Sequence, residues 1–315
     1  MNLNDKTTMI TESAVIVTLM TIFVFLGLYL MPIILFLYPI PFVILGVRHN
    51  VKSSMVTMLA SFILVAILID PLTSVFVTVM LGLLAIILPF MINREYSSYN
   101  IIVVGTLGSF LSIATTLIVS GYVVGVKFYD MLKLNFDSIL NTQKNLLNEM
   151  DLSSYQVEEM IDIFSQGFDY TLLIFPTVLI LFSLFNTYIN YWISAAVLKR
   201  LKYKDIKVPI FSNFRLPSNI ILGIAVIGIG ASIINYYKLF YYDTITLNIY
   251  VLAMFIFFLQ GLAVIMYLLN KTKIRSILKG FIIGILVLSG GLMPIIALIG
   301  LVDTIFDFRR KKGVN

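Results

Sequence analysis

The chain has 315 residues, of which 60% are hydrophobic and only 12% charged, and its mean hydropathy is +1.01. Soluble domains carry about 25% charged residues, so this composition excludes a soluble globular protein and indicates several membrane spans. The absence of cysteine excludes disulfides and thiolate metal sites. The single histidine, His49, excludes His-based metal sites and a Ser-His-Asp triad within one chain.

Nine apolar runs follow along the chain, and they cover residues 13–30, 31–47, 55–69, 72–92, 101–124, 171–198, 219–237, 247–269 and 281–306. The last run is interrupted by Ser289-Gly290-Gly291 and by Pro294, residues that break helices. We expect two short legs there that return to the same side, and the alternative is one kinked helix. The sequence therefore predicts an all-α polytopic membrane protein with about eight full spans plus a C-terminal re-entrant or short-helix hairpin.

The distribution of Lys and Arg predicts the orientation. Basic residues concentrate in the loops 199–217 and 271–279, which are separated by two spans and so lie on one side, the cytoplasmic side. The interval 126–169 holds three basic against eight acidic residues, as expected of an external segment. With a C-terminal hairpin the basic tail 309–312 also lies inside. We therefore expect a multi-pass protein of the cell membrane with both termini cytoplasmic.

The same pattern divides the chain into three parts. Residues 1–200 form a six-span unit with an external helical insert at 126–168, residues 201–217 a basic cytoplasmic loop, and residues 218–315 two spans plus the hairpin and the basic tail. In the insert, Val157, Ile161 and Phe168 have helical spacing, and Ser153 with Gln156 resembles a capping box. The insert is interpreted either as packing on the outer face or as a lid over a site that opens outward.

Polar side chains inside the spans are neutral, which argues against a proton relay or voltage sensor. The candidate ligand-binding residues lie in the fifth, sixth and eighth spans: Ser109, Ser112, Thr116, Ser183, Asn186, Asn190 and Gln260. Small polar residues at helical spacing also allow helices to approach closely, and this alternative stays open. Ala14 and Thr18 of the first span are candidates for helix packing or for docking of a partner.

Two motifs carry a resemblance to a known family. The first contains Pro39 and Pro41 and continues to Asn50, and the second runs from Gly300 to Arg310 and contains Asp303, Asp307 and Arg309. Both resemble the YybS-like predicted bacterial membrane proteins, whose domain has no assigned function. For Asp303 and Asp307, one turn apart beside the basic tail, interfacial salt bridging is weighed against ion binding.

The first six spans are also similar to the substrate-binding S components of energy-coupling-factor transporters. That resemblance implies a small-molecule binding subunit that docks on a transmembrane coupling protein with paired ATPases. It implies docking through small residues on the first helix, where this sequence has Ala14 and Thr18.

Taken together, the sequence predicts a non-enzymatic integral membrane protein that binds a small molecule or lipid. A transport subunit is one form of this function. The alternative is a scaffold or regulatory subunit that recruits a partner through its basic cytoplasmic loops. The lipid bilayer is an expected partner, and no nucleic acid, cofactor or metal is expected.

Overall fold

The computed structural model describes residues 3–150, 153–238 and 241–309, and within these ranges the chain is helical with no strand. The predicted all-α class is thereby confirmed. The chain divides into two compact units, Met1–Phe168 with Val178–Val208 (unit 1) and Asp169–Thr177 with Pro209–Asn315 (unit 2). The boundary after Val208 falls inside the predicted basic loop.

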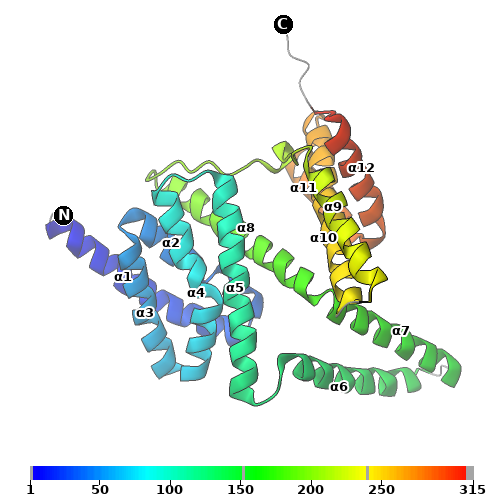
Figure 1. The fold of residues 1–315 in the computed structure, drawn as a ribbon. Coiled ribbons are helices and arrows are strands. Elements are labelled where there is room, and N and C mark those ends of the chain that lie inside the picture. The colour runs from blue at the N-terminus through cyan, green and yellow to red at the C-terminus, as the bar shows by residue number, and fades with distance from the viewer. Residues whose placement is uncertain (1–2, 151–152, 239–240, 310–315) are drawn as a thin grey trace, which may run out of the picture. The chain divides into compact units, whose positions relative to one another are not determined.

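Unit 1 contains most of the first nine helical segments (Figure 1). They are α1 (Leu3–Tyr29), the 3-10 helix η1 (Pro32–Leu37), α2 (Pro39–Arg48), α3 (Val51–Leu68), α4 (Pro71–Asn93), α5 (Ser98–Val124), α6 (Phe128–Asn148), α7 (Ser154–Leu173) and α8 (Phe175–Arg200). Unit 2 contains η2 (Phe211–Asn213), α9 (Ile220–Tyr236), α10 (Tyr242–Asn270), α11 (Ser276–Leu288), η3 (Gly290–Leu292) and α12 (Met293–Phe306), together with the junction of α7 and α8.

Among the described residues, six helices are long and apolar enough to cross a membrane: α1, α3, α4, α5, α8 and α10. The pair formed by α11 and η3–α12 is a seventh candidate. The predicted runs 31–47 and 219–237 form shorter apolar helices, Pro32–Arg48 and Ile220–Tyr236. A multi-pass membrane protein is therefore confirmed, while the count of about eight full spans stays a prediction.

Three helices of unit 1 meet around a proline inside α4. Pro89 lacks the N–H that would donate to the carbonyl of Ala85 one turn earlier. The buried hydroxyl of Ser54 in α3 supplies a donor instead, since it lies 3.1 Å from the Ala85 oxygen. Gly46 of α2 lets the proline ring approach, because a Cβ there would lie 2.8 Å from it. The carbonyl that Pro89 leaves without its helical donor thus has the Ser54 hydroxyl beside it.

The ends of α1, α2 and α4 in unit 1 contact basic residues or the loop that follows α8. Arg48 and His49, at the end of α2, each lie 2.9 Å from a carboxylate oxygen of Glu12 in α1. Tyr203 donates a hydrogen bond of 2.7 Å to the carbonyl of Arg48, and Lys204 donates one of 3.1 Å to a carbonyl at the end of α4. The turn between α3 and α4 lies at the opposite end (Figure 1). Loops that the charge pattern places on one side of the membrane therefore lie together in space.

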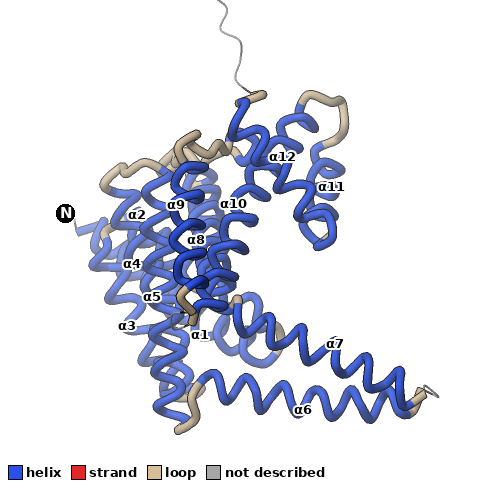
Figure 2. The backbone as a smooth tube through the Cα atoms, turned by 45° about the vertical axis from the view of Figure 1, so that its right-hand side comes forward, coloured by secondary structure: helices blue, strands red, loops and turns tan. Residues whose placement is uncertain are grey.

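The predicted external insert forms an antiparallel helix pair, α6 and α7 (Figure 2). The rings of Phe136 and Phe168 stack with their centroids 3.7 Å apart, and Val157 is buried. The predicted capping box is present, because Ser153 N donates to Gln156 Oε1 at 3.1 Å and Gln156 N donates to Ser153 Oγ at 3.4 Å. Its interpretation as a lid stays a prediction.

In unit 2, α10 and α12 cross with their backbones in contact. A Cβ on Gly261 would lie 1.9 Å from the carbonyl oxygen of Ile296, and a Cβ on Gly300 would lie 1.9 Å from that of Phe257. Both positions therefore require glycine, in the way that small residues let membrane helices approach.

The predicted break in the last apolar run is confirmed. Helix α11 ends at Leu288, and the axis turns by 84° before α12. Glycines at 290 and 291 lie in this bend, and Pro294 lies in the first turn of α12, where its missing N–H costs little. The return of the pair to the side from which it came stays a prediction, and the tail 310–315 lies outside the described residues.

Candidate functional site

The two asparagines predicted to bind a ligand lie in the core of unit 1. Asn186 donates a 3.2 Å hydrogen bond to the hydroxyl of Ser109, which joins α8 to α5. Asn190 donates to the carbonyl of Phe36 in η1 and to the Oδ1 of Asn186, at 2.8 and 2.9 Å. All three polar side chains are at most 2% exposed. The amides therefore cross-link three helical segments, and the Oδ1 of Asn190 is left without a partner.

The remaining polar candidates of these helices bond to backbone carbonyls. Thr116 donates to the carbonyl of Ser112 at 2.9 Å, one turn earlier on α5, and Ser183 donates to Leu179 at 2.7 Å. Ser112 donates across to the carbonyl of Val79 in α4. Hydroxyls that bond inside a tightly packed helix interface favour a packing role. Their assignment as ligand-binding residues stays a prediction.

Gln260 belongs to unit 2 and contacts the C-terminal motif. Its Nε2 donates to Oδ2 of Asp303 at 2.6 Å, and its Oε1 accepts from the backbone N–H of Leu216 at 3.1 Å. Arg309 contacts the same carboxylate oxygen through Nη2 at 2.8 Å and Nε at 3.1 Å. Asp303 and Arg309 are only 2% and 3% exposed, so the motif forms a buried ion pair.

The end of α12 explains how Arg309 reaches Asp303. Asp307 adopts the left-handed conformation with φ of 45°, which terminates the helix and reverses the chain. Arg309 also donates to the carbonyls of Ser212 and Phe214, at 3.0 and 2.7 Å, and so holds the segment before α9. Asp307 pairs with Arg215 at 3.1 Å, and both of these side chains are over 40% exposed.

The other motif and docking candidates have separate surroundings. Pro39 is buried in the first turn of α2, Pro41 is half-buried in the same helix, and both follow the break after η1. Ala14 and Thr18 lie on the exposed face of α1, where Thr18 donates to the carbonyl of Ala14 at 3.1 Å. They are available for contact with lipid or with another chain.

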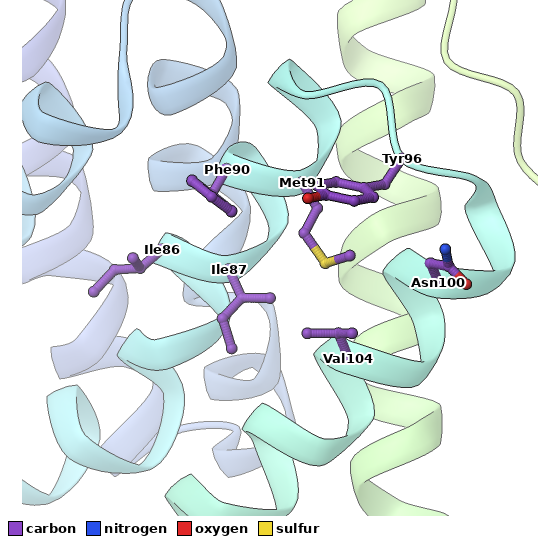
Figure 3. A pocket seen from close by; sticks show the side chains of 7 residues that line it. All are labelled: Ile86, Ile87, Phe90, Met91, Tyr96, Asn100 and Val104. Carbon is purple, nitrogen blue, oxygen red and sulfur yellow. The ribbon is translucent and has the colours of Figure 1, made fainter.

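A groove that sequence reasoning missed lies between α4 and α5 (Figure 3). It has a volume of about 460 Å³ and is lined by Ile86, Ile87, Phe90, Met91, Tyr96, Asn100 and Val104. One turn further along α5 from Val104, the helices α4 and α5 pack closely, as a Cβ on Gly108 would lie 2.2 Å from Cδ1 of Ile87. The groove contains none of the predicted ligand-binding residues.

The groove is apolar along the helices and polar at its end. Ile87, Met91 and Val104 lie between α4 and α5, and the ring of Tyr96 lies beside Met91 (Figure 3). Phe90, Tyr96 and Val104 are each more than 40% exposed. Their exposure places an open apolar surface on the outside of unit 1. No sequence periodicity marks this site, because exposed apolar residues are ordinary on a membrane helix and the depression depends on how two helices diverge.

Asn248 is a polar residue that sequence reasoning also missed. Pro176 lies in the first turn of α8, which begins at Phe175, and Thr177 N donates to Oδ1 of Asn248 at 2.9 Å. Nδ2 of Asn248 donates to the carbonyl of Leu173 at 2.7 Å. One amide thus replaces the helical bond between positions 173 and 177.

The described residues contain no group of three or more His, Asp or Glu side chains that could hold a metal ion. The fold and the groove define a multi-pass helical membrane protein with an apolar groove open to its surroundings.

The chain belongs to the family described as "Predicted membrane protein (DUF2232)", which matches residues 14–304. It is also similar to "Uncharacterized protein YybS" of Bacillus subtilis (strain 168), with 21% identity over 315 residues, covering 97% of this chain and 99% of that protein. The predicted YybS-like family is thereby confirmed. No solved structure matches the chain.

Proposed function

We propose that this protein is a non-catalytic membrane protein that binds a lipid-like amphiphile in the groove between α4 and α5. The observation that carries the proposal is the groove itself, with an apolar wall along the helices and polar Tyr96 and Asn100 at its end. Its volume of about 460 Å³ falls within the roughly 300–1,000 Å³ of ligand pockets. An amphiphile matches both parts, since its chain contacts the wall while its polar head contacts the end.

The buried asparagines are less suited to a ligand than the groove. A polar ligand at Asn186 and Asn190 must replace hydrogen bonds that these side chains already make to Ser109 and to the carbonyl of Phe36. Each such bond contributes about 1 kcal/mol, and a buried carbonyl left alone costs more. The geometry therefore favours the groove as the binding site and the amides as connections between helices.

The chain has a single tryptophan, Trp192, so a fluorescent reporter can be placed in the groove. Trp192→Phe combined with Phe90→Trp gives one tryptophan in the wall. In detergent micelles containing a small fraction of phospholipid with brominated acyl chains, we expect saturable quenching of this tryptophan. Filling the groove by Val104→Phe should abolish the saturable part, because the larger ring occupies the place of the acyl chain.

Val103→Phe is the matched control. Val103 is the neighbouring residue of α5, is similarly exposed, and does not line the groove. It should leave the quenching curve unchanged. Equal curves for the unmodified reporter and its Val104→Phe variant would show that no amphiphile occupies the groove.

A transport subunit is one form of this proposal, and it is supported by the exposed Ala14 and Thr18 on α1. In that form the α1 face contacts a transmembrane coupling protein that works with ATPases. The test is photo-cross-linking in cells from Ala14→Cys labelled with benzophenone maleimide, with the exposed Ile63→Cys of α3 labelled in the same way as control. A specific adduct at position 14 alone supports the docking face, and equal patterns at both positions contradict it.

A second candidate function is a scaffold that recruits a cytoplasmic partner, and the segment after α8 favours it. Lys199 pairs with Asp205 at 3.1 Å, but Arg200, Lys202 and Lys207 are exposed and form no ion pair within the described residues. Replacing Arg200 and Lys202 by Gln should release such a partner and leave reporter quenching unchanged. Because the same charges orient the protein, cysteine accessibility must show that topology is preserved.

A further inference from the structure

Positive charge lies beside the polar end of the groove. The guanidinium carbon of Arg94 is 5.2 Å from the ring centroid of Phe90, one of the residues that line the groove. Arg94 is exposed and forms no ion pair within the part of the chain that the structure describes. A weakly hydrated guanidinium held over an aromatic ring is well placed to bind an anion bidentately.

The neighbouring acidic residue does not neutralise Arg94. Glu95 contacts the ammonium of Lys204 at 3.6 Å, so its charge is balanced by another base. Lys207 approaches from the segment after α8, where its carbonyl accepts from the hydroxyls of Ser98 and Tyr191. Its side chain is exposed and unpaired among the described residues. Arg94 and Lys207 are therefore two positive charges that no acidic side chain balances within the described residues.

The size of the groove indicates which part of an amphiphile it holds. Its α4 wall runs from Ile86 to Met91, a rise of roughly 8 Å at about 1.5 Å per residue. The apolar core of a bilayer is about 30 Å thick. The wall therefore covers only the part of an acyl chain nearest the headgroup, and the rest of that chain lies in the surrounding lipid. Arg94 and Lys207 then lie where the headgroup of that lipid is found.

We propose that the groove selects an anionic phospholipid, with the phosphate bound by Arg94 and one acyl chain along Ile87, Met91 and Val104. This inference rests on the proposed amphiphile binding and adds the class of headgroup. Tyr96 and Asn100 provide neutral hydrogen-bonding groups for the remaining oxygens of the headgroup. A zwitterionic headgroup is disfavoured, because its cationic part adds positive charge beside Arg94.

The groove reporter tests the headgroup directly. Its quenching is titrated with phosphatidylglycerol and with phosphatidylcholine that carry the same brominated chains. A basic residue near a lipid surface contributes about a fivefold change in affinity for an anionic lipid. We expect phosphatidylglycerol to bind more tightly than phosphatidylcholine by at least this factor. Arg94→Gln should reduce that ratio about fivefold, and Arg94→Lys should retain part of it.

Lys271→Gln is the matched control, since the ammonium of Lys271 also lies over an aromatic ring, 4.4 Å from the centroid of Tyr267, and neither residue lines the groove. This variant should keep the lipid ratio of the unmodified reporter. An unchanged ratio in Arg94→Gln would overturn the headgroup inference even where Val104→Phe abolishes quenching. If Val104→Phe leaves quenching intact, the groove is empty, and the amphiphile proposal fails with the headgroup inference.

Discussion

Replacing Arg309 of the C-terminal motif by Leu should destabilise unit 2 more than an ordinary surface change. The guanidinium donates to the carboxylate of Asp303 and to the carbonyls of Ser212 and Phe214, and it is 3% exposed. Arg309→Leu leaves a buried carboxylate without its counter-ion, which costs about 3–5 kcal/mol. Asp303→Leu leaves the guanidinium in the same position and should cost a similar amount.

The double variant distinguishes pairing from packing. With both charges removed, the main loss is two carbonyls and the Nε2 of Gln260 left unpaired at about 1 kcal/mol each, so the double variant should cost about 3 kcal/mol. The two single changes together cost about 6–10 kcal/mol, which implies a coupling energy of at least about 3 kcal/mol.

The assay is unfolding in mixed micelles by titration with sodium dodecyl sulfate, followed by far-ultraviolet circular dichroism. Lys199→Leu is the control, because Lys199 and Asp205 form an ion pair in which both side chains are over 60% exposed. This surface pair should contribute under about 1 kcal/mol. Costs of Arg309→Leu and Asp303→Leu that add to within about 0.5 kcal/mol would refute the pairing argument.

Three further predictions concern packing and topology. Gly300→Ala should lower the free energy of unfolding by about 1–3 kcal/mol, because its Cβ would lie 1.9 Å from a carbonyl oxygen of α10. Gly284→Ala, in an open part of α11, should be neutral or stabilising. A loss at position 300 that is no larger than the loss at position 284 contradicts the close crossing. Asn248→Leu should cost about 2 kcal/mol in the same unfolding titration, since it removes both partners of the junction between α7 and α8, and an unchanged midpoint argues against that role. The chain has no cysteine, so an introduced cysteine is its only maleimide target. An impermeant maleimide should label Ser138→Cys in intact cells and Lys202→Cys only after permeabilisation. The reverse pattern contradicts the predicted orientation.

The helical class and the break in the last apolar run are predictable because hydropathy and glycine act locally. Glycines at 290 and 291 interrupt a run whatever surrounds it, and the structure bends there by 84°. The spacing of Asn186 and Asn190 likewise predicts that the two amides share a helix face. Their partner, the carbonyl of Phe36, is not predictable, since it depends on where η1 ends in space.

The parts that escape prediction depend on contacts between distant segments. Gln260 and Asp303 are 43 positions apart and meet because two glycines let their helices cross. The groove is still less visible in the sequence, because its lining residues are ordinary for a membrane helix. The depression exists where α4 and α5 diverge above Gly108, and no residue type signals that divergence.

The crossing of α10 and α12 has a consequence for how the chain is made. Helix α10 leaves the ribosome before α12, and until α12 arrives the notch at Gly261 has no backbone to fill it. Lipid tails fill so narrow a notch poorly. The packing surface of α10 is therefore completed only after α12 has been inserted, and a chain that ends before Met293 leaves that surface uncovered.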